Sequence, residues 1–278
     1  MPHITHSSST PIVLTIAGSD SGGGAGIQAD IKAISATGSF ACSAITAITS
    51  QNTLGVSAIF PVPLQHVEQQ LDAVFSDLNV VAVKVGMLAD AEIIRVVTAK
   101  ILQYQPRFLV VDPVMVATSG DLLLEQAAIS TLKQLLLPLA NLITPNLPEG
   151  AALTGRPIPN NEDDMTHMIA DLRQLGAGAI LLKGGHLEQD AQSTDLLITP
   201  DRVERLSSKR IATRNTHGTG CTLSSAIASY LAQGNVLHKA VHLGKQYISQ
   251  AIAHADELDI GQGHGPVHHF FDGHRYVR

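Results

Sequence analysis

The chain of 278 residues is 45% hydrophobic and 15% charged, which suits a folded enzyme with a large core and argues against disorder. Its net charge is −6 and Lys and Arg form no basic stripe, so a surface for nucleic acid is not expected. Two cysteines cannot build a disulfide framework, and the absence of a secretory signal or membrane-length apolar run favours a soluble cytoplasmic protein without a membrane partner.

In chain order, apolar runs of strand length alternate with helical patterns. The predicted strands cover residues 11–17, 41–49, 56–62, 80–85, 108–111, 142–143 and 179–182, followed by hairpin-like segments around 195–198 and 202–207. The predicted helices cover residues 27–38, 65–75, 90–102, 125–137, 165–175, 220–232 and 237–255. This alternation predicts an α/β fold with a mostly parallel central sheet and helices on both faces. We expect one domain over residues 11–278, preceded by a poorly ordered segment at residues 1–10.

Polar or glycine-rich motifs follow several of the predicted strands. They lie at residues 18–26, 86–87, 112–120, 146–149 and 183–186. Ligands of open α/β sheets bind outside the carboxyl ends of the strands. The sequence therefore predicts an enzyme whose site lies at that edge of the sheet.

The first glycine-rich turn satisfies a dinucleotide-binding pattern over residues 24–29. An oxidoreductase with this pattern would also need an acidic residue about 20 residues further on, to bind the ribose. The segment at 41–49 offers no acid, so we reject that alternative. The number of glycines indicates instead that the backbone approaches a ligand closely, although a tight turn alone would also use glycine.

The second glycine-rich stretch, Arg-Asn-Thr-His-Gly-Thr-Gly-Cys-Thr at 214–222, leads directly into a predicted helix. Successive N–H groups and the positive end of the helix dipole would converge there on one anion. A phosphoryl group in transfer suits that position. The same field is expected to lower the pKa of Cys221 towards the thiolate. The alternative is an inert buried cysteine at a helix start.

Together, the motifs resemble one family. The stretches AGSDSGGGAGIQAD, SQNT, KVGML, DPVMVATSGD, LITPNLPE, LLKGGH and NTHGTGCTLSSAIA occur in this order. They resemble the hydroxymethylpyrimidine/phosphomethylpyrimidine kinases of thiamin biosynthesis, in the ribokinase-like superfamily, from about residue 12 to residue 270. The resemblance implies a ribokinase-like three-layer fold.

The resemblance also implies a reaction. The expected activity is ATP-dependent phosphorylation of 4-amino-5-hydroxymethyl-2-methylpyrimidine and then of its monophosphate. ATP is the expected co-substrate and Mg²⁺ the expected metal. The small-molecule substrates are the expected partners, and a homo-oligomer, in the form of a homodimer, is the expected assembly.

On the substrate side, the resemblance points to five residues. Gln51 matches the glutamine that contacts the pyrimidine, and its amide can donate and accept hydrogen bonds at once. Asp30 and Gly18 match other substrate-side positions, while Met87 and Val114 match apolar contacts to the ring. Asp30 could alternatively be an acid on a helix surface.

The catalytic match is to an anion hole. It consists of Gly218, Thr219, Gly220 and Cys221. Many superfamily members carry Asp at the position of Cys221, where it acts as a base on the substrate hydroxyl. We therefore hypothesise that Cys221 accepts the hydroxyl proton.

On the nucleotide side, Asn146 and Glu149 match an Asn-x-x-Glu motif that organises Mg²⁺, and Asp112 is expected to support the same metal. Pro148 leaves an ordinary helix start as the alternative for that motif. Lys183 is expected to meet an ATP phosphate, unless it is simply solvated.

Further nucleotide contacts are expected from the second glycine-rich stretch, through Thr216 and His217. One contact is missing from the family pattern, because Thr118 stands where many relatives carry Lys. Among the thirteen histidines, those near the termini lack the paired spacing of a zinc site on a helix, so we expect no such site. These are His3, His6, His264, His268 and His269.

Two other functions remain open. A pyridoxal or pyridoxine kinase of the same superfamily binds a ring of similar size, although Gln51 and Met87 favour the pyrimidine. A catalytically idle pyrimidine sensor would bind without turning over ATP. The kinase prediction requires that the amides preceding Cys221 lie beside the cleft that contains Gln51.

Overall fold

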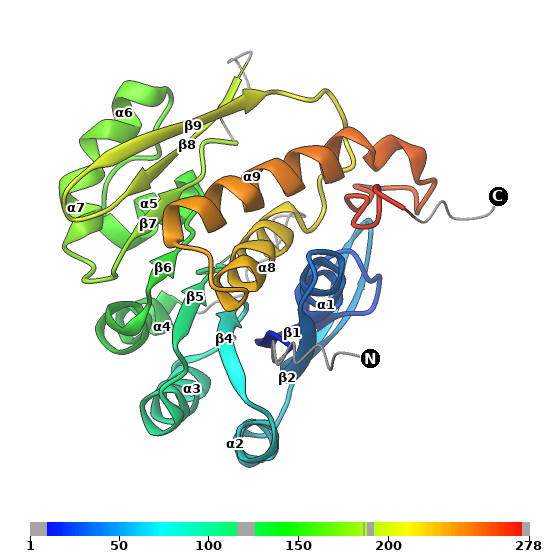
Figure 1. Cartoon of the computed structure of the whole chain (residues 1–278), viewed down its shortest axis with the longest axis vertical. Coiled ribbons are helices and arrows are strands. Elements are labelled where there is room, and N and C mark those ends of the chain that lie inside the picture. The colour runs from blue at the N-terminus through cyan, green and yellow to red at the C-terminus, as the bar shows by residue number, and fades with distance from the viewer. Residues whose placement is uncertain (1–9, 116–125, 186, 188–191, 274–278) are drawn as a thin grey trace, which may run out of the picture.

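The computed structural model describes residues 10–115, 126–185, 187 and 192–273. The expected N-terminal segment up to residue 9, Thr118 and His186 lie outside this part of the chain. Within it, a nine-stranded sheet has the order β3-β2-β1-β4-β5-β6-β7-β8-β9 (Figure 1). The strands are β1 (Ile12–Asp20), β2 (Phe40–Asn52), β3 (Gly55–Pro61), β4 (Val80–Val85), β5 (Phe108–Val111), β6 (Leu142–Ile143), β7 (Ile180–Leu182), β8 (Gln192–Ile198) and β9 (Val203–Lys209).

The middle of the sheet is parallel, from β2 through β1, β4, β5 and β6 to β7. Antiparallel hairpins extend it at both edges, β2–β3 at one and β7–β8–β9 at the other. The mostly parallel sheet predicted from the sequence is therefore confirmed. The carboxyl ends of the parallel strands share one edge, where the predicted motifs must gather.

Two helical layers cover the sheet. One contains α1 (Gly26–Ala36), α8 (Thr219–Ala232) and α9 (Leu237–Ala253), as Figure 1 shows. The other contains α2 (Leu64–Asp77), α3 (Ala91–Tyr104), α4 (Gln126–Thr131), α5 (Leu147–Thr154), α6 (Glu162–His167) and α7 (Ile169–Arg173). No helix in the described ranges is both long enough and apolar enough to cross a membrane.

The strands contribute side chains to the hydrophobic core on both faces of the sheet, because successive side chains point to opposite faces. In β5, Leu109 and Val111 belong to the core under α2–α7, while Val110 belongs to the core under α8 and α9. All three are at most 2% exposed. A strand buried on both faces reads as a continuous apolar run, which is the pattern seen in the sequence. The three-layer fold follows from this double burial.

The helix boundaries differ from the sequence prediction in two places. The helix predicted at 165–175 divides into α6 and α7 around Met168. The helix predicted at 125–137 begins as α4 and continues as a π-helical turn and a 3-10 turn that contains Pro138. Proline removes a backbone donor and clashes with the preceding turn, which explains the irregular end.

A buried ion pair joins both helices of the α1–α8 pair to the sheet. Nζ of Lys84 in β4 lies 2.8 and 2.9 Å from the two carboxylate oxygens of Asp30 in α1. Both side chains are fully buried. The same carboxylate accepts a hydrogen bond of 2.6 Å from Thr15 in β1 and one of 2.7 Å from Ser225 in α8. Although burial opposes it, the Asp30 carboxylate raises the pKa of Lys84 above its ordinary value.

We expect Lys84→Met to lower the free energy of unfolding by about 3–5 kcal/mol, because it leaves the Asp30 carboxylate buried without its cation. Guanidinium denaturation followed by circular dichroism measures this loss. Arg156→Met is the matched control, since Arg156 pairs with Asp171 while its own side chain is 57% exposed. That change should cost less than about 1 kcal/mol. Equal losses in the two variants would contradict a central role for the buried pair.

Candidate active site

The first glycine-rich turn is folded around the carboxylate of Asp20, at the end of β1. The N–H of Gly22 donates to Oδ1 at 2.8 Å, and those of Gly24 and Ala25 donate to Oδ2 at 3.0 and 2.8 Å. Partial burial acts to raise the pKa of Asp20, but His217 and these N–H groups outweigh it and lower the pKa. The glycines allow this turn because each N–H must reach one small carboxylate.

The two glycine-rich segments touch each other. Nε2 of His217 lies 2.9 Å from Oδ2 of Asp20 and 3.4 Å from Nε2 of Gln51. A Cβ on Gly218 would collide with the backbone oxygen of Gly24. The predicted juxtaposition of the segment before Cys221 with Gln51 is therefore present.

The N-terminus of α8 offers unpaired backbone donors. Gly218 precedes the helix in a left-handed conformation, with φ of 78°. The hydroxyl and the N–H of Thr219 both donate to the carbonyl of Thr216, at 2.7 and 3.2 Å. Within the described residues, the N–H groups of Gly220 and Cys221 meet no acceptor. With the helix dipole behind them, these two donors form a site for an anion.

A charged cluster lies beside these donors. Nζ of Lys183, at the end of β7, is 2.9 Å from Oδ1 of Asp112, at the end of β5. Thr144 donates to the same oxygen at 3.0 Å. A Cβ on Gly220 would lie 3.2 Å from Nζ of Lys183 and 3.3 Å from Oδ2 of Asp112. Glycine at position 220 thus lets the start of α8 approach a lysine and a carboxylate.

Asn146 and Glu149 form a capping box at the start of α5. The side chain of Asn146 accepts from the N–H of Glu149, and the Glu149 carboxylate accepts from the N–H of Asn146, both at 2.8 Å. The helix start considered from the sequence is therefore real. Burial raises the pKa of Glu149 to about 7, with Lys183 lowering it and Asp112 raising it.

This cluster therefore contains two carboxyl groups and one ammonium. Lys183 forms an ion pair with Asp112 and also interacts electrostatically with Glu149. Oxygen ligands and an excess of negative charge are what Mg²⁺ prefers. The residues present thus fit the metal expected from the sequence. Asp112 and Lys183 also lie next to Gly220 at the start of α8.

Cys221 differs from the sequence prediction. Burial raises the pKa of its thiol to about 11; Lys84 and the N–H of Gly26 act in the opposite direction, but Asp30 and Asp112 add to the rise. The pKa of Cys221 is thus shifted in the direction opposite to the one expected from the helix dipole, and this shift favours the neutral thiol. Burial outweighs the dipole, and the carboxylates of Asp30 and Asp112 act in the same direction as burial.

Asp30 also differs from its expected role. Its side chain is fully buried, and its two oxygens already accept hydrogen bonds from Lys84, Thr15 and Ser225. This burial corrects the prediction that it touches a substrate and also the alternative of a surface acid. The Asp30 carboxylate has a structural role: its contacts with Lys84 and Ser225 hold α1 and α8 in position.

The other substrate-side residues gather at the ends of four adjacent strands, β2, β1, β4 and β5. A Cβ on Gly18 in β1 would lie 3.0 Å from Sδ of Met87, just after β4, so glycine lets the sulfur pack against the backbone. The side chain of Gln51 in β2 is half-buried, and its oxygen accepts from Thr49 at 3.1 Å. Val114 is half-buried and follows Asp112 at the end of β5.

Two residues of the site were missed in the sequence. Asp20 lies inside the quoted AGSDSGGG motif, and its spacing to three nearby glycines was a usable signal. Lys84 is a lysine in an otherwise apolar buried strand, a placement that requires a partner. His217, expected at the nucleotide, instead directs Nε2 to Asp20 and is 8% exposed.

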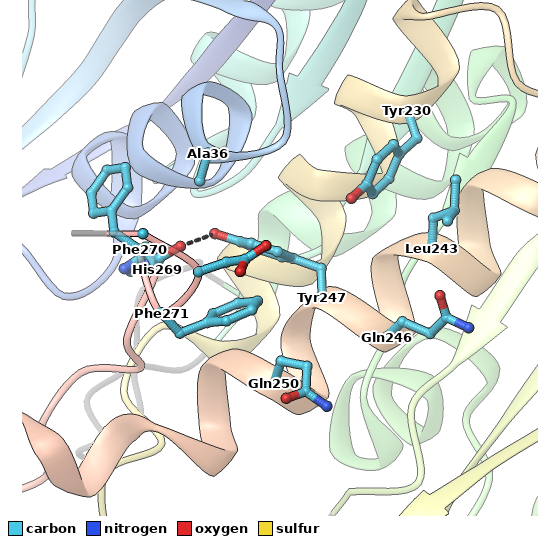
Figure 2. A pocket seen from close by; sticks show the side chains of 11 residues that line it. Ala36, Tyr230, Leu243, Gln246, Tyr247, Gln250, His269, Phe270 and Phe271 are labelled. Carbon is cyan, nitrogen blue, oxygen red and sulfur yellow. Dashed lines mark hydrogen bonds between the residues drawn. The ribbon is translucent and has the colours of Figure 1, made fainter. Parts of the chain in front are cut away.

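A cavity of about 450 Å³ lies elsewhere, between α1, α8, α9 and the C-terminal segment (Figure 2). Its lining contains Tyr230, Tyr247 and Phe271, and none of the described site residues. Figure 2 shows the Tyr247 hydroxyl donating to the backbone oxygen of His269, at 2.8 Å. Burial lowers the pKa of His269 to about 3, and Nε2 of its ring shares a hydrogen bond of 2.9 Å with the Thr222 hydroxyl. His269 is thus a structural support for α8.

The comparisons with known proteins agree with this geometry. A family model described as phosphomethylpyrimidine kinase matches residues 20–268. A hydroxymethylpyrimidine/phosphomethylpyrimidine kinase from Rhizobium meliloti (strain 1021) is 54% identical over 94% of this chain and 97% of that protein.

Solved structures show the same fold. A phosphomethylpyrimidine kinase from Clostridium difficile 630 is 45% identical, with a TM-score of 0.76 over 87% of this chain and 99% of that one. An ADP complex of Bacillus subtilis pyridoxal kinase is 34% identical, with a TM-score of 0.87 over 94% and 98%. The ribokinase-like fold expected from the sequence is thereby confirmed. With its glycine-rich segments in contact and its relatives so similar over nearly their whole length, the chain belongs to the phosphomethylpyrimidine kinase family.

Proposed function

We propose that this protein uses ATP to phosphorylate 4-amino-5-hydroxymethyl-2-methylpyrimidine and then its monophosphate, which supplies the diphosphate for thiamin biosynthesis. The observation that carries the proposal is the contact between His217, next to the free amides of α8, and Gln51. It brings the N-terminus of α8 and a half-buried amide side chain together at one edge of the sheet. The names of the relatives support this substrate class.

In this proposal the chain acts mainly by positioning and by electrostatics. The N–H groups of Gly220 and Cys221 stabilise charge on the transferring phosphoryl group, and Lys183 meets an ATP phosphate. Thr216 and Asn146 would contact the nucleotide. Because phosphoryl transfer passes through a loose transition state, it asks little of a base. A neutral Cys221 is compatible with that chemistry as a group that positions the substrate hydroxyl.

Asp112 and Glu149 would hold Mg²⁺. When bound, the metal neutralises charge on the phosphates and helps to orient them. On the substrate side, the Gln51 amide would bind the aminopyrimidine edge, while Gly18, Met87 and Val114 shape the space for the ring. Asp30 supports both sides indirectly through Lys84 and Ser225.

The second candidate is phosphorylation of pyridoxine or pyridoxal. The favouring observation is the TM-score of 0.87 to a pyridoxal kinase, over almost the whole of both chains. The decisive experiment incubates purified protein with ATP, Mg²⁺ and each alcohol, and measures kcat/KM and the masses of the products.

We expect mono- and diphosphate products from the aminopyrimidine and a higher kcat/KM for it than for pyridoxine. A preference for pyridoxine would select the second candidate instead. Binding of the pyrimidine without any ATP turnover would identify a sensor rather than an enzyme.

The metal assignment predicts a selective effect of Glu149→Gln. Its amide oxygen can still accept from Asn146, but one negative charge is removed, so half-maximal activity should require at least about tenfold more Mg²⁺. Titration of activity against Mg²⁺ measures this. Glu162→Gln is a control, because Glu162 is likewise an acid in the first turn of a helix, α6. The same Mg²⁺ dependence in both variants would remove Glu149 from the metal site.

The neutral thiol of Cys221 predicts a particular pH profile. Since its pKa is about 11, kcat should not rise with the thiolate fraction between about pH 7 and about pH 9. Cys221→Ser should keep the profile, while Cys221→Ala should lower kcat by up to about 100-fold through loss of positioning. A wild-type rise of about tenfold per pH unit that disappears in the serine variant would show that the thiolate is the base. Full kcat in the alanine variant would exclude both roles.

We also propose that the protein is a cytoplasmic homodimer. ATP is available in the cytoplasm, and the β2–β3 hairpin offers an apolar surface for a second copy. Ile48 and Phe60 face each other across the hairpin and are 51% and 63% exposed. Exposed apolar pairs of this kind are common at protein interfaces. Sedimentation equilibrium tests the dimer.

A further inference from the structure

A cluster of two histidines and a glutamate lies away from the candidate active site. His238 and His242 occupy the first two turns of α9, and Glu204 lies in the edge strand β9. Nε2 of His242 is 2.7 Å from Oε1 of Glu204, and Nε2 of His238 is 2.9 Å from the same oxygen. The three residues offer ligand atoms that all lie within 4.8 Å of one another. The sequence expectation of no zinc-type histidine pair on a helix overlooked this i, i+4 pair.

The hydrogen bonds within the cluster leave one buried oxygen atom without a donor in the described part of the chain. Oε2 of Glu204 is buried and accepts no hydrogen bond from the described residues, although Nε2 of His238 lies only 2.8 Å away. A buried carboxylate oxygen without a donor is costly. An additional positive group between the carboxylate and the two imidazoles would satisfy it.

The cluster is open to solvent on the side of its histidines. The side chains of His238 and His242 are 43% and 41% exposed, so an ion can reach them from solvent.

We propose that Glu204, His238 and His242 form a binding site for a divalent transition-metal ion, with Zn²⁺ as the best-matched ion. Two imidazole nitrogens and one carboxylate are a common zinc ligand set, and a fourth position would remain for water. Imidazole ligands select such ions over Mg²⁺, which prefers oxygen. Ligand atoms around tetrahedral Zn²⁺ are about 3.3 Å apart, so the cluster needs to open by only about half an ångström.

The position of the cluster suggests a structural role. Strand β9 ends the sheet, and its pairing partner within the described residues is β8. An ion held by Glu204 and the two histidines would clip this edge strand to α9. The start of α9 follows the C-terminal end of α8, whereas the candidate active site lies at the N-terminal end of α8. The proposed metal site is therefore separate from the carboxylates proposed to hold Mg²⁺.

The test is a titration of the full chain with Zn²⁺ by calorimetry, together with thermal unfolding. The wild type is expected to bind an ion that raises the unfolding midpoint by about 5 °C at saturating Zn²⁺. His242→Ala and Glu204→Gln should each weaken this binding by at least about tenfold and abolish the shift. The visible spectrum of the Co²⁺ form should indicate a tetrahedral site in the wild type alone.

His254→Ala is the matched control, because His254 pairs with Glu257 just beyond the other end of α9. It should bind Zn²⁺ as the wild type does. The Glu204→Gln variant nearly preserves side-chain shape, so it decides the matter even if His242→Ala fails to fold. Unchanged Zn²⁺ affinity in Glu204→Gln, or no binding by the wild type, would overturn the proposal.

Discussion

The fully buried pair of Lys84 and Asp30 fixes the geometry on which the whole site depends. The Asp30 carboxylate in α1 pairs with the ammonium of Lys84 in β4 and also accepts a hydrogen bond from Ser225, in the middle of α8. The two helices follow the two glycine-rich segments. Anchoring them to one point of the sheet sets the distance between the turn at Asp20 and the free amides at Cys221. Buried ion pairs add little net stability compared with apolar packing, but this pair favours one arrangement of α1 and α8 on the sheet.

A second lysine and carboxylate lie on the other side of the α8 N-terminus. Lys183 meets Asp112, and the carboxyl group of Glu149, whose pKa burial raises to about 7, belongs to the same cluster. The inner pair has one carboxylate for one ammonium, whereas the outer cluster has two carboxyl groups for one ammonium. The Lys84–Asp30 pair and the cluster of Lys183, Asp112 and Glu149 are close together: the adjacent residues Ser224 and Ser225 of α8 contact Asp112 and Asp30. The difference between them is the count of charges rather than the types of residue.

Local patterns in the sequence predicted much of the fold. Each parallel strand of the sheet corresponds to an apolar run, because burial on both faces requires apolar side chains at successive positions. Glycine at 218 and 220 likewise indicated a close approach of the backbone, which the structure shows against Gly24 and against Lys183 and Asp112. The seven ordered motifs also contain Gln51 and Glu149, whose roles remain predictions.

Contacts between distant segments could not be read in this way. Lys84 and Asp30 are separated by 54 positions and Asp20 and His217 by 197. No local pattern specifies such partners, although an isolated lysine in an apolar strand calls for one. The pKa of Cys221 depends on the same distant groups, so the helix dipole alone gave the wrong direction. Met168 interrupts a helix whose apolar spacing looked continuous.

The protonated state of Cys221 has a consequence for the chemical durability of the enzyme. Peroxides and alkylating agents attack thiolates, and a thiol with a pKa of about 11 offers them almost none. A cysteine can therefore stand at the centre of this anion hole without being a redox-sensitive point. Peroxide is therefore expected to react slowly with this side chain.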